Sequence, residues 1–137
     1  GRDDVIGVLT PGSEGSTFGG YPLASVVGTY AIKTLIDEQL TQNAQIRGSQ
    51  LMDGLNDIKN EFSSKIKIVR GRGLLTAFEM FDEKKLDGHH ISVALMENGI
   101  YAKETHHTTI RLAPALTINE SQINDLLEGV RNVVKSL

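Results

Sequence analysis

The sequence has no cysteine, no concentrated run of lysine or arginine, and no apolar stretch long enough to span a bilayer. Without cysteine, the chain cannot form disulfides, thiolate metal sites or cysteine nucleophiles, and it fits an intracellular compartment. We expect the cytoplasm in preference to the mitochondrion. A net charge of -3 argues against a nucleic-acid or anionic-membrane surface, because both normally need a basic face. We therefore expect no nucleic-acid partner and no membrane partner.

The length of 137 residues, 39% of them hydrophobic, suffices for one compact core. Residues 1–21 have a single short apolar patch and are otherwise turn-forming, so they should form an arm that packs elsewhere. The sequence opens with Gly1 rather than methionine. This start suggests a processed product or a fragment of a longer protein.

Apolar residues recur at helical spacing from Pro22 to Leu40 and again from Ala44 to Phe62. Two successive helices are expected, with a junction near residues 37–41. A final helix is predicted after Asn119, which can cap it, while Gln122 stands where a capping box needs it.

Between these helices the apolar period changes to that of strands. Ile66 and Ile68 alternate with lysines, and residues 74–81 form a second β-prone run, so two antiparallel strands are expected. A polar loop at 82–88, a short helix at 91–98 ending at a left-handed Gly99, and strands at 100–103 and 109–112 should follow. The sum is an α+β fold with about four antiparallel strands and helices on one face.

The most informative motif is G-S-E-G-S-T-F-G-G-Y-P at residues 12–22. Its glycines let main-chain N-H groups approach an anion, and Ser16 and Thr17 add hydroxyl donors. Pro22 suits the first turn of a helix, whose positive end favours the same anion. An ordinary turn would show a similar composition. Nucleotide motifs do not fit, because the loop lacks a Walker lysine and Gly71-Arg72-Gly73 lacks the third glycine of a dinucleotide fingerprint.

Arg111 is the second candidate, in the segment T-I-R-L-A-P. It should point away from the side that Ile110 and Leu112 face, and its planar fork suits a carboxylate. A surface arginine paired with an acidic neighbour is the simpler alternative.

Other polar clusters favour structural interpretations. The pairs His89-His90 and His106-His107 cannot chelate by themselves, because adjacent side chains diverge, so solvated loop histidines are expected and no metal site. The segment R-G-R-G at residues 70–73 fits an anion nest or a tight hairpin equally well.

Three spaced motifs together resemble a known family: the loop at 12–24, R-G-R-G-L at 70–74, and G-I-Y-A-K-E-T-H followed by I-R-L-A-P at 99–116. In this order they resemble the C-terminal part of class III pyridoxal-phosphate (PLP) aminotransferases. The A-K-E-T-H segment favours the ornithine-type members.

The resemblance implies a homodimeric transaminase that moves the δ-amino group of ornithine to 2-oxoglutarate, giving glutamate semialdehyde and glutamate. It implies that Ser16 and Thr17 contact the PLP phosphate of the neighbouring subunit and that Arg111 binds a carboxylate of the amino- or oxo-acid substrate. It also implies that residues 1–21 belong to a large domain absent here, and that residues 22–137 form the small domain with its connecting helix.

The family's Schiff-base lysine lies upstream of the glycine loop, so this chain alone is expected to be inactive. Lys33, Lys59 and Lys103 match no Schiff-base motif. Glu14 and Tyr21 stand where the family usually has histidine and asparagine. The alternative is an autonomous module that binds an amino acid or only dimerises, without catalysis.

Overall fold

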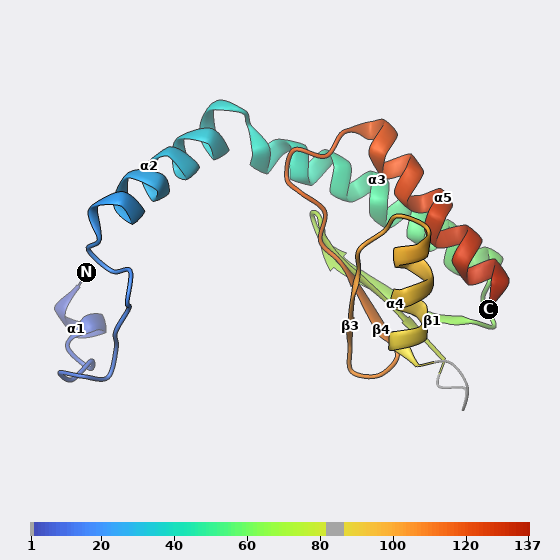
Figure 1. The fold of residues 1–137 in the computed structure, drawn as a ribbon, viewed down its shortest axis with the longest axis horizontal. Helices are drawn as coiled ribbons and strands as arrows, with labels where there is room; N and C mark the ends of the chain where they lie inside the picture. Colours follow the sequence, from blue (N-terminus) through green and yellow to red (C-terminus); the bar gives the residue numbers. More distant parts are fainter. Residues whose placement is uncertain (1, 82–86) are drawn as a thin grey trace. The chain divides into compact units, whose positions relative to one another are not determined.

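The computed structural model describes residues 2–81 and 87–137, which divide into two compact units, Gly1–Glu38 and Gln39–Leu137 (Figure 1). The first unit holds helices α1 (Asp3–Ile6) and α2 (Pro22–Asp37). The second unit holds three helices and a four-stranded sheet within its described residues. Each unit is considered by itself below.

The first unit contains little buried surface. Neither α1 nor α2 has a buried residue, and the apolar side chains of α2 include Leu23, Val26 and Tyr30, all more than half exposed. The one-turn α1 lies within the expected arm, where the sequence predicted only turns. Pro22 begins α2 as predicted, but Tyr21 supplies no side-chain cap. The helix therefore begins without the hydrogen bond that asparagine would give.

Helix α3 (Leu40–Glu61) begins the second unit after Gln39, which adopts left-handed torsions with φ of 51°. The two-helix interpretation with a junction near residues 37–41 is confirmed. One stripe of α3 enters the core, because Leu51, Leu55 and Ile58 are fully buried.

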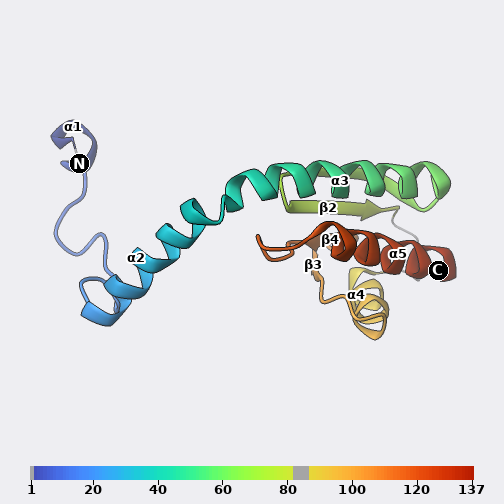
Figure 2. The same ribbon diagram turned by 90° about the horizontal axis from the view of Figure 1, so that it is seen from above.

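The sheet consists of β1 (Ile66–Arg72), β2 (Leu75–Met80), β3 (Lys103–Thr105) and β4 (Thr109–Leu112). Its order is β1-β2-β4-β3 and each neighbouring pair is antiparallel. Figure 2 shows α3 running alongside the sheet. Phe78 and Ile110, which are Cα partners on β2 and β4, are fully buried within the same core cluster as residues of α3 and α5. The predicted α+β class is confirmed.

Two strand predictions need correction. Ile66 is buried but Ile68 is 40% exposed, because the β1–β2 register shifts between them and the irregularity turns Ile68 to the other face. The strand expected at 100–103 begins only at Lys103. Ala102 is buried, while Tyr101 is exposed, so the segment before Lys103 still contributes to the core without pairing.

Helix α4 (Gly88–Glu97) begins earlier than expected, and its first turn contains His89 and His90. Its start is fixed by Asp87, whose Oδ1 accepts a hydrogen bond of 3.0 Å from the backbone N-H of His90. Of the predicted polar loop at 82–88, residues 82–86 lie outside the described residues. Gly99 follows α4 with φ of 78°, as predicted.

Helix α5 (Glu120–Ser136) has the predicted capping box. The Asn119 Oδ1 accepts from the Gln122 N-H at 2.9 Å, and the Gln122 Oε1 accepts from the Asn119 N-H at 3.0 Å. The helix places Ile123, Val130 and Val134 in the core, all fully buried. The apolar stripe predicted from the sequence is therefore the buried face of α5.

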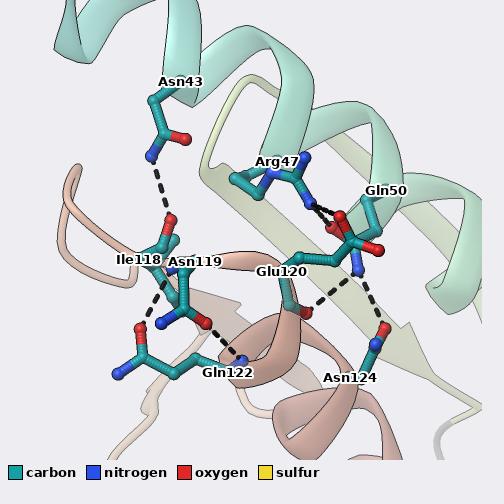
Figure 3. A network of polar contacts seen from close by, with 8 residues as sticks. All are labelled: Asn43, Arg47, Gln50, Ile118, Asn119, Glu120, Gln122 and Asn124. Carbon is teal, nitrogen blue, oxygen red and sulfur yellow. Dashed lines mark hydrogen bonds and ion pairs between the residues drawn. The ribbon is translucent and has the colours of Figure 1, made fainter.

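Polar side chains of α3 hold the beginning of α5 (Figure 3). Asn43 Nδ2 donates to the carbonyl oxygens of Leu116 and Ile118 at 2.7 and 2.9 Å. Gln50 Nε2 donates to Asn124 Oδ1 at 2.8 Å, and Arg47 is ion-paired to Glu120 at 3.0 Å. The two Asn43 bonds satisfy carbonyl groups of the segment that leads from the sheet to α5, and the other two contacts join side chains of the two helices.

Gly48 of α3 is predicted to be irreplaceable. A Cβ at this position would lie 2.3 Å from the carbonyl carbon of Gly73, in the turn between β1 and β2. Gly48→Ala should therefore force α3 away from the hairpin and lower the free energy of unfolding by about 1–3 kcal/mol. Chemical denaturation followed by circular dichroism measures the loss.

Gly28→Ala is the matched control, because a Cβ at Gly28 of α2 meets nothing within 4 Å. It should leave the unfolding of the second unit unchanged and increase helicity, since alanine exceeds glycine in helix propensity by about 1 kcal/mol. Equal stability of the Gly48→Ala chain and the unsubstituted chain would contradict the predicted clash.

Candidate functional site

The glycine loop of the first unit is exposed along its whole length, residues 11–21. Gly12 and Gly20 have φ of 86° and 75°, the left-handed torsions predicted from the sequence. The loop is held by a few local bonds, among them one of 3.3 Å from the Gly19 N-H to the Ser16 carbonyl and one of 3.1 Å from the Tyr21 N-H to the Phe18 carbonyl. It runs directly into the start of α2.

The two loop hydroxyls differ in their hydrogen bonding. Ser16 Oγ accepts a bond of 3.3 Å from the backbone N-H of Phe18, whereas the Thr17 hydroxyl has no partner among the described residues. In the first turn of α2, Pro22 has no N-H and the Ser25 N-H donates to the Tyr21 carbonyl at 3.0 Å, so the N-H groups of Leu23 and Ala24 are the ones without a partner within the helix. Glu14 is exposed, so its carboxylate can turn toward solvent. Unused donors next to a helix N-terminus fit a phosphate group.

Arg111 lies on β4 of the second unit, between the buried Ile110 and Leu112, and is itself exposed. The prediction that it points away from the side of its neighbours is confirmed. Within residues 2–81 and 87–137, no acidic group lies within ion-pair distance of its guanidinium. Its five N-H donors are thus available to an anion, and its planar fork suits a carboxylate.

The sheet face that carries Arg111, opposite the face of Phe78 and Ile110, is called the outer face here. Cross-strand register places Arg70, Ala77, Arg111 and Lys103 in one row on it. By register, the outer face carries Arg70, Arg72, Lys103, Arg111 and Glu79, and the Lys67 ammonium reaches Glu79 there, whereas the Lys103 ammonium lies 3.6 Å from Glu104 Oε1. A chain of net charge -3 therefore presents a locally basic face.

Glu79 neutralises part of this charge. Its Oε1 lies 2.7 Å from Lys67 Nζ and its Oε2 lies 2.9 Å from Arg70 Nη1. Hydrogen bonds from Lys67 and then from Arg70 lower the pKa of the Glu79 carboxyl below its ordinary value. The Glu79 carboxylate thus pairs with two of the three cations of β1, Lys67 and Arg70.

The R-G-R-G segment forms a hairpin. Arg72 pairs with Leu75 across a two-residue turn, and Gly73 supplies the left-handed torsion with φ of 56°. A Cβ on Gly71 would lie 2.6 Å from the Leu75 carbonyl oxygen, so the close approach of β1 and β2 requires glycine there. Of the two interpretations left open by the sequence, the hairpin accounts for both glycines.

The histidine pairs lie in two different local structures. His89 and His90 are in the first turn of α4 rather than in a loop, whereas His106 and His107 form the turn between β3 and β4 with positive φ. His90 Nδ1 lies 2.7 Å from Asp87 Oδ1. The pKa of Asp87 is lowered, first by the bond from the His90 N-H and then by its side chain. In the part of the chain that the structure describes, no three His, Asp or Glu side chains gather as a metal site would require.

The sequence-predicted site residues fall in both units. Ser16 and Thr17 belong to the first unit and Arg111 to the second. Lys103 is the Cα partner of Arg111, which only the β3–β4 register shows, and its ammonium lies 3.6 Å from Glu104 Oε1. Among the described residues, no helix has the length and apolar character needed to cross a membrane.

Comparisons with known proteins agree with one another. The family model described as Aminotransferase class-III matches residues 1–134. The mitochondrial ornithine aminotransferase of Arabidopsis thaliana is 39% identical over 134 residues, which cover 96% of this chain and 28% of the plant protein. The ornithine aminotransferase of Staphylococcus carnosus is 43% identical over 95% of this chain and 31% of its own. The chain thus spans less than a third of these relatives.

Solved structures give the same result. The ornithine aminotransferase from Toxoplasma gondii superposes with a TM-score of 0.85 at 38% identity, covering 99% of this chain and 32% of that chain. The acetylornithine aminotransferase from Elizabethkingia anophelis gives a TM-score of 0.86 at 34% identity, covering 99% of this chain and 34% of that chain. Because the family model spans almost every residue and the relatives agree, the chain belongs to the class III aminotransferases, a family of PLP-dependent transaminases.

Proposed function

We propose that the chain is the C-terminal portion of an ornithine-type aminotransferase, which transfers the δ-amino group of ornithine to 2-oxoglutarate. The observation that carries this proposal is its similarity to ornithine aminotransferases over 95% or more of the chain but less than a third of each relative. In the complete enzyme, PLP supplies the electron sink for amino-group transfer. The residues of this chain bind and orient groups on cofactor and substrate.

Ser16 and Thr17 would bind the phosphate of a PLP held by the neighbouring subunit of a homodimer. Both hydroxyls keep their O-H donor, because Ser16 Oγ only accepts a bond from the Phe18 N-H and the Thr17 hydroxyl has no partner among the described residues. Glycine at positions 15 and 20 leaves the loop open, since a Cβ at either would meet nothing within 4 Å. These features support a phosphate contact made by hydroxyl and main-chain donors.

Arg111 would bind a carboxylate of the amino- or oxo-acid substrate. Its side chain is exposed and has no acidic partner among the described residues, so binding need not break an existing ion pair. A bidentate contact would fix the orientation of the substrate as well as its position. Through this contact, β4 would hold a carboxylate end of the substrate.

The isolated chain would not transaminate. The family's cofactor-linked lysine lies outside it, and Lys33, Lys59 and Lys103 match no such motif. Residues 1–21 would belong with a large domain and residues 22–137 with the small domain and its connecting helix. The exposed apolar side chains of α2 support this division, because a helix with an uncovered apolar surface normally packs against further protein.

A module that binds an amino acid without PLP is the competing function, favoured by the separate core of the second unit. Calorimetry of the isolated chain with ornithine, 2-oxoglutarate and PLP discriminates between them. Strong binding of ornithine in the absence of PLP would favour the module over the enzyme portion.

Thr17→Ala in the complete enzyme should weaken PLP binding by about tenfold to a hundredfold, because a charge-assisted hydrogen bond to the phosphate is lost. Titration of the apoenzyme with PLP, followed by absorbance, measures the dissociation constant. Thr10→Ala is the control, since Thr10 is an exposed threonine before the glycine loop. Unchanged affinity in Thr17→Ala would rule out the phosphate role.

Arg111→Lys in the complete enzyme should raise the KM for 2-oxoglutarate by about tenfold or more, because lysine keeps the charge but loses the fork. Arg111→Gln should raise it further. Steady-state kinetics at saturating ornithine and varied 2-oxoglutarate measures both KM values. Arg72→Gln removes a cation from the same face but two strands away, and it should leave this KM within about twofold of the parent value. Equal effects of Arg72→Gln and Arg111→Gln would contradict a specific carboxylate contact.

A further inference from the structure

Asn98 and Gly99, at the end of α4, form the only asparagine-glycine pair in the chain. We propose that this pair is a self-modifying site, at which the Gly99 backbone nitrogen attacks the Asn98 side-chain amide and water converts the product to isoaspartate or aspartate. The cap of α4 controls the reaction, because the cap and the attack use the same nitrogen. The site needs only water and does not depend on the proposed transaminase function.

A Schellman motif ends α4. Asn98 is the C-cap with φ of -95° and ψ of 17°, and Gly99 follows in the left-handed region with φ of 78°. The Gly99 N-H donates to the Met96 carbonyl at 3.0 Å, and the Ile100 N-H donates to the Leu95 carbonyl at 2.9 Å. These two bonds define the motif. They hold the Gly99 nitrogen as a hydrogen-bond donor to the helix.

The other six asparagines lie where the same attack is disfavoured. Five are within α3 or α5, where the following N-H belongs to the hydrogen-bond ladder of the helix: Asn43, Asn56, Asn60, Asn124 and Asn132. The sixth, Asn119, is held by the capping box of α5. Each of the six is followed by a residue with a side chain, whereas glycine leaves the asparagine amide open to the following nitrogen.

The Asn98 amide is accessible to water. Asn98 and Gly99 are exposed, and together with Gln122 and Asp125 of α5 they line a cavity of about 330 Å³. Asn98 Nδ2 donates to the Ala94 carbonyl at 2.9 Å, while Asn98 Oδ1 has no partner among the described residues. Solvent can therefore reach the amide carbon, supply the water for hydrolysis and carry away the ammonia.

The reaction balances with water alone. The Gly99 nitrogen loses its proton and forms a bond to Asn98 Cγ, the bond from Cγ to Nδ2 breaks, and the released nitrogen takes up a proton and leaves as ammonia. The product is a cyclic imide. Water then opens the ring at the side-chain carbonyl, which gives aspartate, or at the main-chain carbonyl, which gives isoaspartate. No atom is oxidised or reduced in either step.

The cap and the reaction exclude each other. Attack requires the Gly99 nitrogen to turn from the Met96 carbonyl toward Asn98 Cγ, and the imide nitrogen carries no hydrogen to donate. Ile100 keeps the cap closed, because it packs against the core, and a Cβ on Gly129 of α5 would lie only 2.4 Å from Ile100 Cδ1. The rate of modification is therefore set by how often this end of α4 opens.

Modification weakens the end of the helix that controlled it. A carboxylate at position 98 cannot donate to the Ala94 carbonyl, and it adds negative charge beside the negative end of the helix dipole. Isoaspartate also lengthens the main chain by a methylene group, which displaces Ile100 from its bond to Leu95. Each modified molecule thus keeps a loosened end of α4.

The test incubates the 137-residue chain in mildly alkaline buffer, folded and in guanidinium chloride, and quantifies aspartate and isoaspartate at each asparagine by peptide mass spectrometry. In the folded chain, Asn98 should react before any other asparagine, at a rate about tenfold or more below that in guanidinium chloride. Ile100→Ala should raise the rate in the folded chain about threefold or more, because it loosens the cap. Met96→Ala, which truncates an exposed side chain of the same helix, should leave the rate within about twofold.

The absence of product at Asn98 in the folded chain, or earlier product at another asparagine, overturns the site. Equal rates in the folded chain and in guanidinium chloride overturn the control by the cap, as do equal rates in Ile100→Ala and Met96→Ala. Circular dichroism before incubation confirms that each variant is folded.

Asn98→Asp carries one of the two products and tests the consequence. It should accelerate hydrogen exchange of the Gly99 and Ile100 amides about twofold to fivefold, as expected for a carboxylate at a helix C-terminus. NMR measures this exchange, and an unchanged rate contradicts the loosened end of α4.

Discussion

The antiparallel register of the four strands is the constraint on which the second unit depends. Because side chains alternate between the two faces, pairing Phe78 with Ile110 in the core also sends Ala77 and Arg111 to the outer face. A slip of one residue would exchange the faces, burying an arginine and exposing two large apolar side chains. The core therefore fixes the position of Arg111 as firmly as it fixes that of its buried neighbours. The position of Arg111 on the outer face thus follows from the packing of apolar side chains on the opposite face of the sheet.

The first unit is not stabilised by a hydrophobic core of its own helices, because neither α1 nor α2 has a buried residue. Its conformation comes from local rules: left-handed glycines, a proline at the start of α2, and short turn bonds around Ser16 and Phe18. Such a loop can present hydroxyl and N-H donors, yet it cannot by itself exclude water from them. A phosphate contact here gains strength only where further protein covers the loop, as the proposed enzyme would provide.

Local signals were the ones that the sequence predicted well. The capping box at Asn119 and Gln122, Pro22 at the start of α2 and the left-handed Gly99 each depend on residues close in sequence, and all are confirmed. The strand predictions were wrong where the pairing between strands determines which face a residue occupies. Alternation at Ile66 and Ile68 predicted a regular strand, but the register shift reverses one of them. No local pattern announces such a bulge, because it depends on what the partner strand offers.

The site shows the same division. The glycine loop and Arg111 stood out by motif, whereas the ion pairs of Glu79 with Lys67 and Arg70 depend on the pairing of β1 with β2. Composition was a poor guide for the same reason: the net charge of -3 and the absence of a basic run describe the chain, not a face. Screening limits the reach of exposed charges to about 8 Å at physiological salt, so a small anion responds to the nearest side chains. At the outer face Arg111 is such a side chain, because Glu79 is shared between Lys67 and Arg70 and Glu104 is ion-paired with Lys103. An acidic chain can thus carry an anion site wherever its own carboxylates are committed to other cations.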